Sequence, residues 1–152
     1  MDYNFGNHDA YLFPEQSLGS QYKVDYLLVG FNSDSCNLVL VEFEDPNANF
    51  IISSYNSETE AVRKGISQIR DWRRWLDNHR STFLMDFGLI QKGYDVPTTR
   101  TYYYLVVSKR DNMNEEARLL RNEISSGYTN MKIVTYDRLA DNVEKLYGRN
   151  TW

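Results

Sequence analysis

The spacing of apolar and polar positions along the chain predicts an α/β domain. Short apolar runs rich in β-branched and aromatic residues predict strands at about 22–30, 37–44, 101–108 and 131–135. A long helix is predicted over about 57–79, because apolar residues recur there at helical spacing: Val62, Ile66, Ile69, Trp72 and Leu76. Two shorter helices are expected at 114–125 and 137–147. Strands that come first and then alternate with helices indicate a sheet with helices on its faces.

The ends of these elements carry their own signals. Ser57-Glu58-Thr59-Glu60 has the pattern of a capping box, so the long helix is expected to start at Ser57. Residues 1–20 show no convincing helix and are expected to be an irregular N-terminal segment, with a short strand over 11–18 that Pro14 interrupts. At 152 residues, the chain is long enough for one domain with a substantial core, and we expect a single domain over 1–152.

Two neighbouring strands carry carboxylates at positions where apolar residues are expected. Side chains alternate along a strand, so Lys23 and Asp25 share a face with Leu27 and Val29. On the next strand Leu38, Leu40, Glu42 and Glu44 share a face in the same way. Turn-forming residues between the strands predict a hairpin, which would bring Asp25 roughly opposite Glu42, with their Cβ atoms about 4.5–5.5 Å apart.

Such an arrangement of acids has two interpretations. Buried carboxylates this close repel one another unless a cation or a shared proton lies between them, and oxygen ligands of this kind suit Mg²⁺ or Mn²⁺. The other interpretation is that Asp25, Glu42 and Glu44 are ordinary edge-strand charges that face water.

The predicted long helix carries a second polar feature. Ala61, Gly65, Gln68, Trp72 and Trp75 lie along one of its sides. Glycine costs about 1 kcal/mol relative to alanine inside a helix, so Gly65 indicates a close approach to another backbone. Gln68 then points near that contact, where its amide could orient a metal-bound water or a phosphate. It could equally satisfy a buried backbone group, which is the commoner role.

Charge is distributed unevenly along the chain. The formal net charge of −4 does not indicate a nucleic-acid-binding protein, but residues 61–80 are locally basic. Arg63, Lys64, Arg70, Arg73 and Arg74 either face phosphates or form an ordinary solvated helix face. Cys36 is the only cysteine, and no N-terminal stretch has the apolarity of a signal peptide or a membrane span. We therefore expect a cytoplasmic protein that does not bind a membrane.

Three stretches resemble a known family: residues 23–28, 40–46 and 66–72. In order they carry Asp25, then Glu42-Phe43-Glu44, then Gln68, which resembles the PD-(D/E)xK nuclease signature. More narrowly, they are similar to the C-terminal nuclease domain of Shedu anti-phage defence proteins, and the similarity spans about residues 20–140. The resemblance implies a restriction-endonuclease-like mixed sheet flanked by helices, and a metal-dependent DNA endonuclease or nickase.

The resemblance also implies roles for individual residues. Asp25, Glu42 and the backbone carbonyl of Phe43 would bind Mg²⁺ or Mn²⁺. The motif lysine is replaced by Glu44, which leaves three alternatives. Glu44 is a third ligand or a general base, or a lysine comes from elsewhere, namely Lys23 or Lys64, or the site is inactive. Retention of Asp25, Glu42 and Gln68 in order favours activity, so the expected catalytic set is Asp25, Glu42, Glu44, Gln68 and Lys23.

The expected partners also follow from the resemblance. DNA is the expected substrate, with Arg63, Lys64, Arg70 and Arg74 as its contacts, and a homo-oligomer is expected by analogy. Shedu proteins carry a sensing region ahead of the nuclease, for which this chain leaves no room. Sensing would come from a separate sensor protein or from oligomerisation, unless this is a minimal version. The alternative function is a catalytically inactive module of the same fold that binds nucleic acid or a protein partner.

Overall fold

A computed structural model describes residues 9–31, 35–52, 57–90 and 93–141. In chain order, its elements are β1 (Asp9–Leu18), β2 (Tyr22–Phe31), β3 (Cys36–Phe43), β4 (Ile51–Ile52), β5 (Ser57–Glu58), α1 (Glu60–Asp86), η1 (Thr98–Arg100), β6 (Thr101–Val106), η2 (Arg110–Asn112), α2 (Glu115–Ser126) and β7 (Met131–Val134). The strands predicted at about 22–30, 37–44, 101–108 and 131–135 are therefore confirmed as β2, β3, β6 and β7. The helix predicted at 114–125 is confirmed as α2, with Asn114 as its N-cap.

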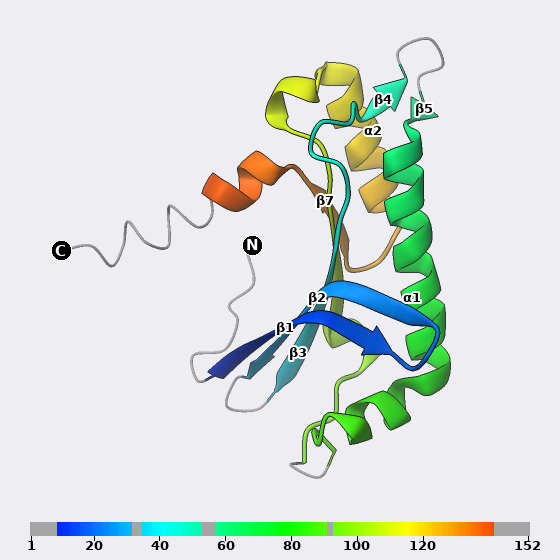
Figure 1. Cartoon of the computed structure of the whole chain (residues 1–152), viewed down its shortest axis with the longest axis vertical. Helices are drawn as coiled ribbons and strands as arrows, with labels where there is room; N and C mark the ends of the chain where they lie inside the picture. The colour runs from blue at the N-terminus through cyan, green and yellow to red at the C-terminus, as the bar shows by residue number, and fades with distance from the viewer. Residues whose placement is uncertain (1–8, 32–34, 53–56, 91–92, 142–152) are drawn as a thin grey trace, which may run out of the picture.

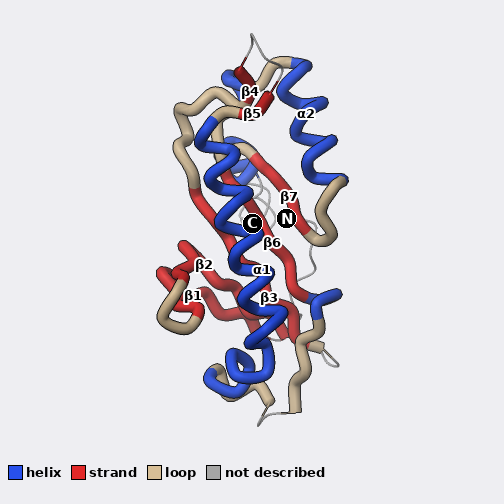
Figure 2. Tube along the Cα trace, turned by 90° about the vertical axis from the view of Figure 1, so that its right-hand side faces the viewer, coloured by secondary structure: helices blue, strands red, loops and turns tan. Residues whose placement is uncertain are grey.

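The centre of the molecule is a five-stranded mixed sheet in the order β1-β2-β3-β6-β7. β1, β2 and β3 are antiparallel neighbours, whereas β6 runs parallel to both β3 and β7. Figure 1 shows the sheet with α1 and α2 on one side, and Figure 2 shows α1 running across that face. The predicted α/β fold, a mixed sheet flanked by helices, is confirmed and is compatible with a restriction-endonuclease-like architecture.

Apolar side chains fill both faces of the sheet. Under α1, Leu27, Leu40 and Leu105 from the strands pack in one core with Ile69 and Trp72 from the helix. A smaller core lies on the opposite face, built on Val39, Val41, Tyr104 and Val106 and flanked by Leu139. Leu139 belongs to a helical segment over residues 136–141, which lies across the sheet from α1 (Figure 1). The part of the predicted 137–147 helix beyond residue 141 lies outside the described residues.

The predicted start of the long helix at Ser57 is wrong. Ser57 and Glu58 form β5 instead, paired with β4, and α1 begins at Glu60 after Thr59 as N-cap. The Thr59 hydroxyl donates to the carbonyl of Asn49 rather than capping the helix. The helix also continues past the predicted end and reaches Asp86, with a kink at His79, where φ is −131°.

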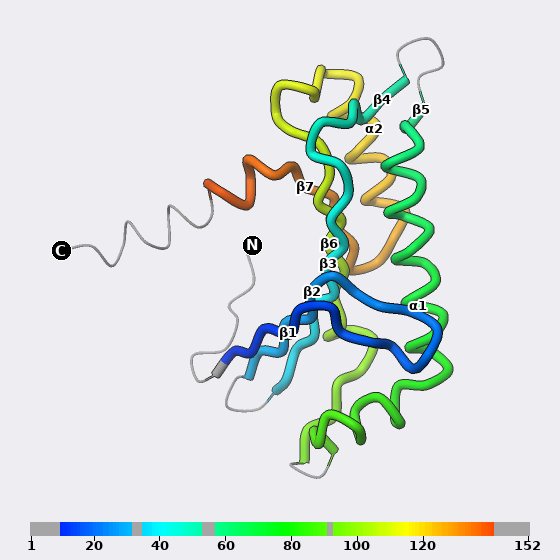
Figure 3. The backbone as a smooth tube through the Cα atoms, viewed as in Figure 1, coloured from blue at the N-terminus to red at the C-terminus, as the bar shows by residue number. Residues whose placement is uncertain are grey.

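The short strand predicted over 11–18 is confirmed as β1, which begins earlier, at Asp9, so the N-terminal segment is more regular than predicted. β1 pairs with β2 on both sides of Glu15, which has φ 50° and takes up an interruption directly after Pro14. Figure 3 shows β1 and β2 as a long hairpin that reaches α1 at its turn. Residues 1–8 lie outside the described residues, as do the hairpin residues 32–34.

Among the helices that the structure describes, none combines the length and apolarity needed to cross a membrane.

Candidate functional site

Three acidic side chains gather where β2 and β3 end their pairing, and we refer to Asp25, Glu42 and Glu44 as the carboxylate cluster. The β2–β3 ladder runs from Phe31 opposite Cys36 to Tyr26 opposite Val41. Asp25 and Glu42 are the next residues beyond its last pair, so the predicted register is confirmed. Glu42 is 6% exposed and the Glu44 side chain 8% exposed, whereas Asp25 is half-buried.

The Asp25 side chain joins the two strands after the backbone ladder has ended. Its Oδ2 accepts a hydrogen bond of 2.7 Å from the backbone N–H of Phe43. The carboxyl of Glu42 lies close enough to Asp25 for the Asp25 charge to oppose its ionisation. Two carboxylates this close repel one another unless one of them carries a proton or a cation lies between them. The arrangement therefore favours a proton, or a cation in its place, between Asp25 and Glu42.

The electrostatics of the cluster agree with this geometry. The pKa of Glu42 is raised from 4.5 to about 8, first by burial and then by the charges of Asp25 and Glu44, against the opposing effect of Lys64. Burial likewise raises the pKa of Glu44, and the ammonium of Lys64 acts to lower it. A site whose acids are hard to ionise together is a site at which a bound cation is strongly stabilised.

Helix α1 lies directly over the cluster because Gly65 lets it approach. A Cβ on Gly65 would lie 2.3 Å from Cδ1 of Leu105 and 3.2 Å from Cγ of Glu44. The close approach predicted from Gly65 is thus confirmed, although the atoms it meets belong to side chains rather than to backbone. The preceding residue in the helix, Lys64, places its Nζ 3.6 Å from Oε1 of Glu44.

Lys23 does not join the cluster. Val24 and Leu27 both lie in the core under α1, so the strict alternation expected from Leu27 back to Lys23 is broken near Asp25. This is the point at which β2 faces the interruption in β1, where Gln16 pairs with Val24 and Pro14 with Tyr26. Lys23 is exposed, and within the described ranges no ion pair connects it to an acid of the cluster.

Gln68 lies on α1 one turn beyond Gly65 and is half-buried. Its amide makes no hydrogen bond to any other residue that the structure describes. The amide therefore has hydrogen-bonding capacity to spare, and both roles considered for it from the sequence stay open.

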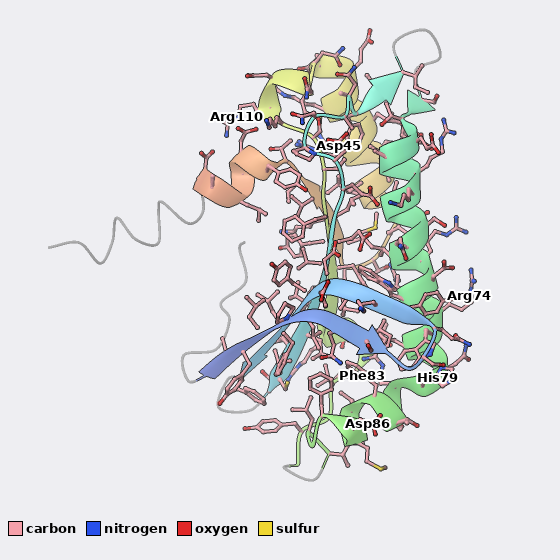
Figure 4. The ribbon with its side chains drawn as sticks, in the orientation of Figure 1. Asp45, Arg74, His79, Phe83, Asp86 and Arg110 are labelled. Carbon is pink, nitrogen blue, oxygen red and sulfur yellow. The ribbon has the colours of Figure 1, made fainter. Side chains whose placement is uncertain are left out.

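The basic residues of α1 differ in how strongly they are engaged. Arg63 pairs with Glu58, and Arg74 pairs with Asp71 at 3.4 Å on the outer side of the helix (Figure 4). Arg70 is exposed. Arg73 has a structural role, because its guanidinium donates to the carbonyl of Thr129 and stacks over the Tyr103 ring. Its Cζ lies 5.3 Å from the centroid of that ring.

Phe43 turns its side chain away from the carboxylates, to the other face of the sheet. Its ring packs against Tyr26 and Tyr136, with centroid separations of 5.6 Å and 5.7 Å. The Tyr136 hydroxyl donates to the backbone carbonyl of Glu44. Sequence reasoning did not include Tyr136, since it is far from Glu44 in the chain and no local pattern marks it.

A pocket of about 480 Å³ opens on this side of Asp25. It is lined by Pro14, Glu15, Asp25, Tyr26, Phe43 and Tyr136. The half-buried Asp25 is therefore reachable from outside, whereas Glu42 and Glu44 are covered by α1.

The donor set of the cluster fits a hard divalent cation in its chemistry. All its side-chain donors are carboxylate oxygens, which Mg²⁺ and Mn²⁺ prefer, and Oε1 of Glu44 is buried without a hydrogen-bond partner. Within the part of the chain that the structure describes, no three Asp, Glu, His or Cys side chains already converge as a metal cage. Holding a cation here would require the acids to turn toward one another.

Comparison with known families shows to which family the chain belongs. A family model described as the C-terminal region of the Shedu protein SduA matches residues 4–140. The chain belongs to the Shedu family. Among curated proteins, none matches the chain significantly.

Membership in the Shedu family associates the chain with anti-phage defence. The matched residues include the whole mixed sheet, from β1 to β7, together with α1 and α2. The carboxylate cluster and Lys64 therefore lie inside the region that defines the Shedu match.

Proposed function

We propose that this Shedu domain is a metal-dependent DNA endonuclease or nickase that hydrolyses phosphodiester bonds. The observation that carries the proposal is the placement of Asp25 beside Glu42 just beyond the end of the β2–β3 ladder, where burial and neighbouring charges raise the pKa of Glu42 to about 8. A fold gains no stability from acids held in this way, because burying carboxylates without partners is costly. Perturbed acids in a reachable site are more often kept for chemistry.

Asp25, Glu42 and the carbonyl of Phe43 would hold Mg²⁺ or Mn²⁺. When bound, such an ion lowers the pKa of a water and stabilises negative charge on a phosphate. Asp25 would be aimed by its hydrogen bond to the Phe43 amide, and Glu42 by its place under α1. Glu44 adds a third negative charge, which increases the affinity of the site for a cation.

The substrate would approach a surface that α1 makes locally basic. Arg63, Lys64, Arg70 and Arg74 are exposed on this helix, whereas the whole chain has a formal charge of −4. Of these residues, Lys64 lies close to the acids, where its charge would offset their repulsion of the phosphates. Gln68 lies one turn beyond Gly65 on α1, and its unused amide would hold a phosphate or a water.

A second function is favoured by one observation. Glu44 stands where the nuclease motif has a lysine, and a site without that cation suits a catalytically inactive module that binds DNA or a protein partner. A separate sensor protein and assembly into a homo-oligomer fit either function.

The test is cleavage of supercoiled plasmid with Mg²⁺ or Mn²⁺ by the wild type, by Glu42→Gln and by the control Glu116→Gln. Glu116 is exposed on α2, so the control makes the same chemical change outside the cluster. We expect metal-dependent nicking by the wild type and the control, and a loss of about 10³-fold or more in Glu42→Gln. DNA binding without cleavage by all three proteins would favour the inactive module. Equal cleavage by wild type and Glu42→Gln would refute the site.

A further inference from the structure

Glu44 occupies the position at which the nuclease motif carries a lysine, so its charge is opposite to the one that the motif places there. Its side chain is 8% exposed and points at α1, where Gly65 leaves room for it. Oε1 of Glu44 has no hydrogen-bond partner, and the nearest cation is Nζ of Lys64 at 3.6 Å. A buried acid that faces one lysine across a helix–strand contact is a natural anchor for that lysine.

Lys64 combines this contact with access to solvent. Its side chain is 65% exposed, so the ammonium reaches the cluster from the outer side of the site. Its positive charge acts on Glu42 as well as on Glu44, lowering the pKa of both. The other charges that act on these two acids, from Asp25 and Asp45, are negative. Lys64 is thus placed to touch a phosphate that approaches the cluster.

We propose that Lys64 on α1 supplies the cation that the nuclease motif carries on the strand. Glu44, which directly follows β3, holds this lysine in position. The inference rests on the proposed function and names a catalytic residue for it. In this arrangement the cation comes from the helix rather than from the strand, so the site keeps a cation beside the reacting phosphate. Lys64 is the catalytic residue and Glu44 a positioning residue.

The first experiment measures plasmid nicking at saturating protein with Mn²⁺ for wild type, Lys64→Ala, Lys64→Arg and the control Arg118→Ala. Arg118 is exposed on α2, so its loss changes the net charge equally outside the site. We expect Lys64→Ala to lose about 10²-fold in the single-turnover rate, as when one group that stabilises transition-state charge is removed. Lys64→Arg should retain most of the rate, and Arg118→Ala all of it.

The second experiment exchanges the two charges. Lys64→Glu alone should be inactive, whereas the combination of Lys64→Glu with Glu44→Lys should recover to within about tenfold of the wild-type rate. A purely structural ion pair at an exposed lysine would change stability only slightly and would leave the single-turnover rate unchanged. DNA affinity in EDTA, measured for the same proteins, separates loss of binding from loss of chemistry.

Each outcome decides between the two proposals. Absence of cleavage by the wild type with every metal would overturn the nuclease function and the role of Lys64 with it. Cleavage by the wild type that survives intact in Lys64→Ala would overturn the role of Lys64 alone. Loss of cleavage in Lys23→Ala with retention in Lys64→Ala would transfer the role to Lys23.

Discussion

The two ends of the β2–β3 hairpin are built from the same two strands but in opposite ways. At the end near the hairpin loop, Leu27 pairs with Leu40 and Val29 with Leu38, and all four are buried under α1. At the other end the ladder stops after Tyr26 and Val41, and acids take the next positions. There the carboxylate of Asp25, rather than a backbone carbonyl, accepts from the Phe43 amide.

This contrast separates stability from chemistry within one element. The apolar end removes hydrocarbon from water, which stabilises the fold. The acidic end buries Glu42 and Glu44 at a cost that only a proton, a metal ion or Lys64 can offset. We therefore expect substitutions at the two ends to act on different properties of the protein.

The largest effect on stability is expected at the apolar end. Leu40→Ala would remove a fully buried side chain between the sheet and α1, at a cost of about 2–5 kcal/mol in the free energy of unfolding. Urea unfolding followed by circular dichroism measures this change. Leu119→Ala is the control, since Leu119 is 61% exposed on α2 and should change stability little. Similar losses in both variants would mean that the core under α1 is wrongly placed.

A smaller effect is expected where α1 meets the cluster. Gly65→Ala would bring a methyl group within 2.3 Å of Cδ1 of Leu105, so the helix or the leucine must shift. We expect a loss of about 1–3 kcal/mol from overpacking, although alanine is the better helix former. Adding Leu105→Val should recover part of the loss. A Gly65→Ala protein as stable as the wild type would contradict the close approach.

The paired strands and the register between Asp25 and Glu42 could be predicted from the sequence, because strand alternation and hairpin formation are local rules. The close approach at Gly65 could also be predicted, since glycine destabilises a helix interior and is expected there only where space is short. The start of α1 could not be predicted, because Ser57 and Glu58 form a strand by pairing with β4, which lies earlier in the chain.

The environment of the acids depended on contacts that no local pattern reveals. Lys64 and Glu44 meet only because α1 crosses β3 at Gly65, and Tyr136 reaches the carbonyl of Glu44 from the other face of the sheet. The alternation of β2 is broken near Asp25 because the pairing with β1 is interrupted at Glu15. Such contacts follow from packing between distant segments rather than from spacing.

The pKa of Glu42 predicts how stability depends on pH. Its pKa is raised from 4.5 to about 8 in the folded protein, so between these values the folded state holds a proton that the unfolded state has lost. The free energy of unfolding must then fall as the pH rises from about 4.5 to 8, by at most about 1.4 kcal/mol per pH unit for one proton. The raised pKa of Glu44 acts in the same direction. In Glu42→Gln the free energy of unfolding should fall less over this pH range than in the wild type.

A divalent cation should reverse this trend, because it binds the ionised acids and stabilises the folded state. The most direct test is therefore the free energy of unfolding from pH 5 to 9, measured in EDTA and in Mn²⁺, for the wild type and Glu42→Gln. We predict that the two wild-type curves coincide near pH 5 and diverge as the pH rises, with the Mn²⁺ curve above, whereas those of Glu42→Gln stay together. Wild-type curves that coincide at every pH would contradict a metal site at the carboxylate cluster.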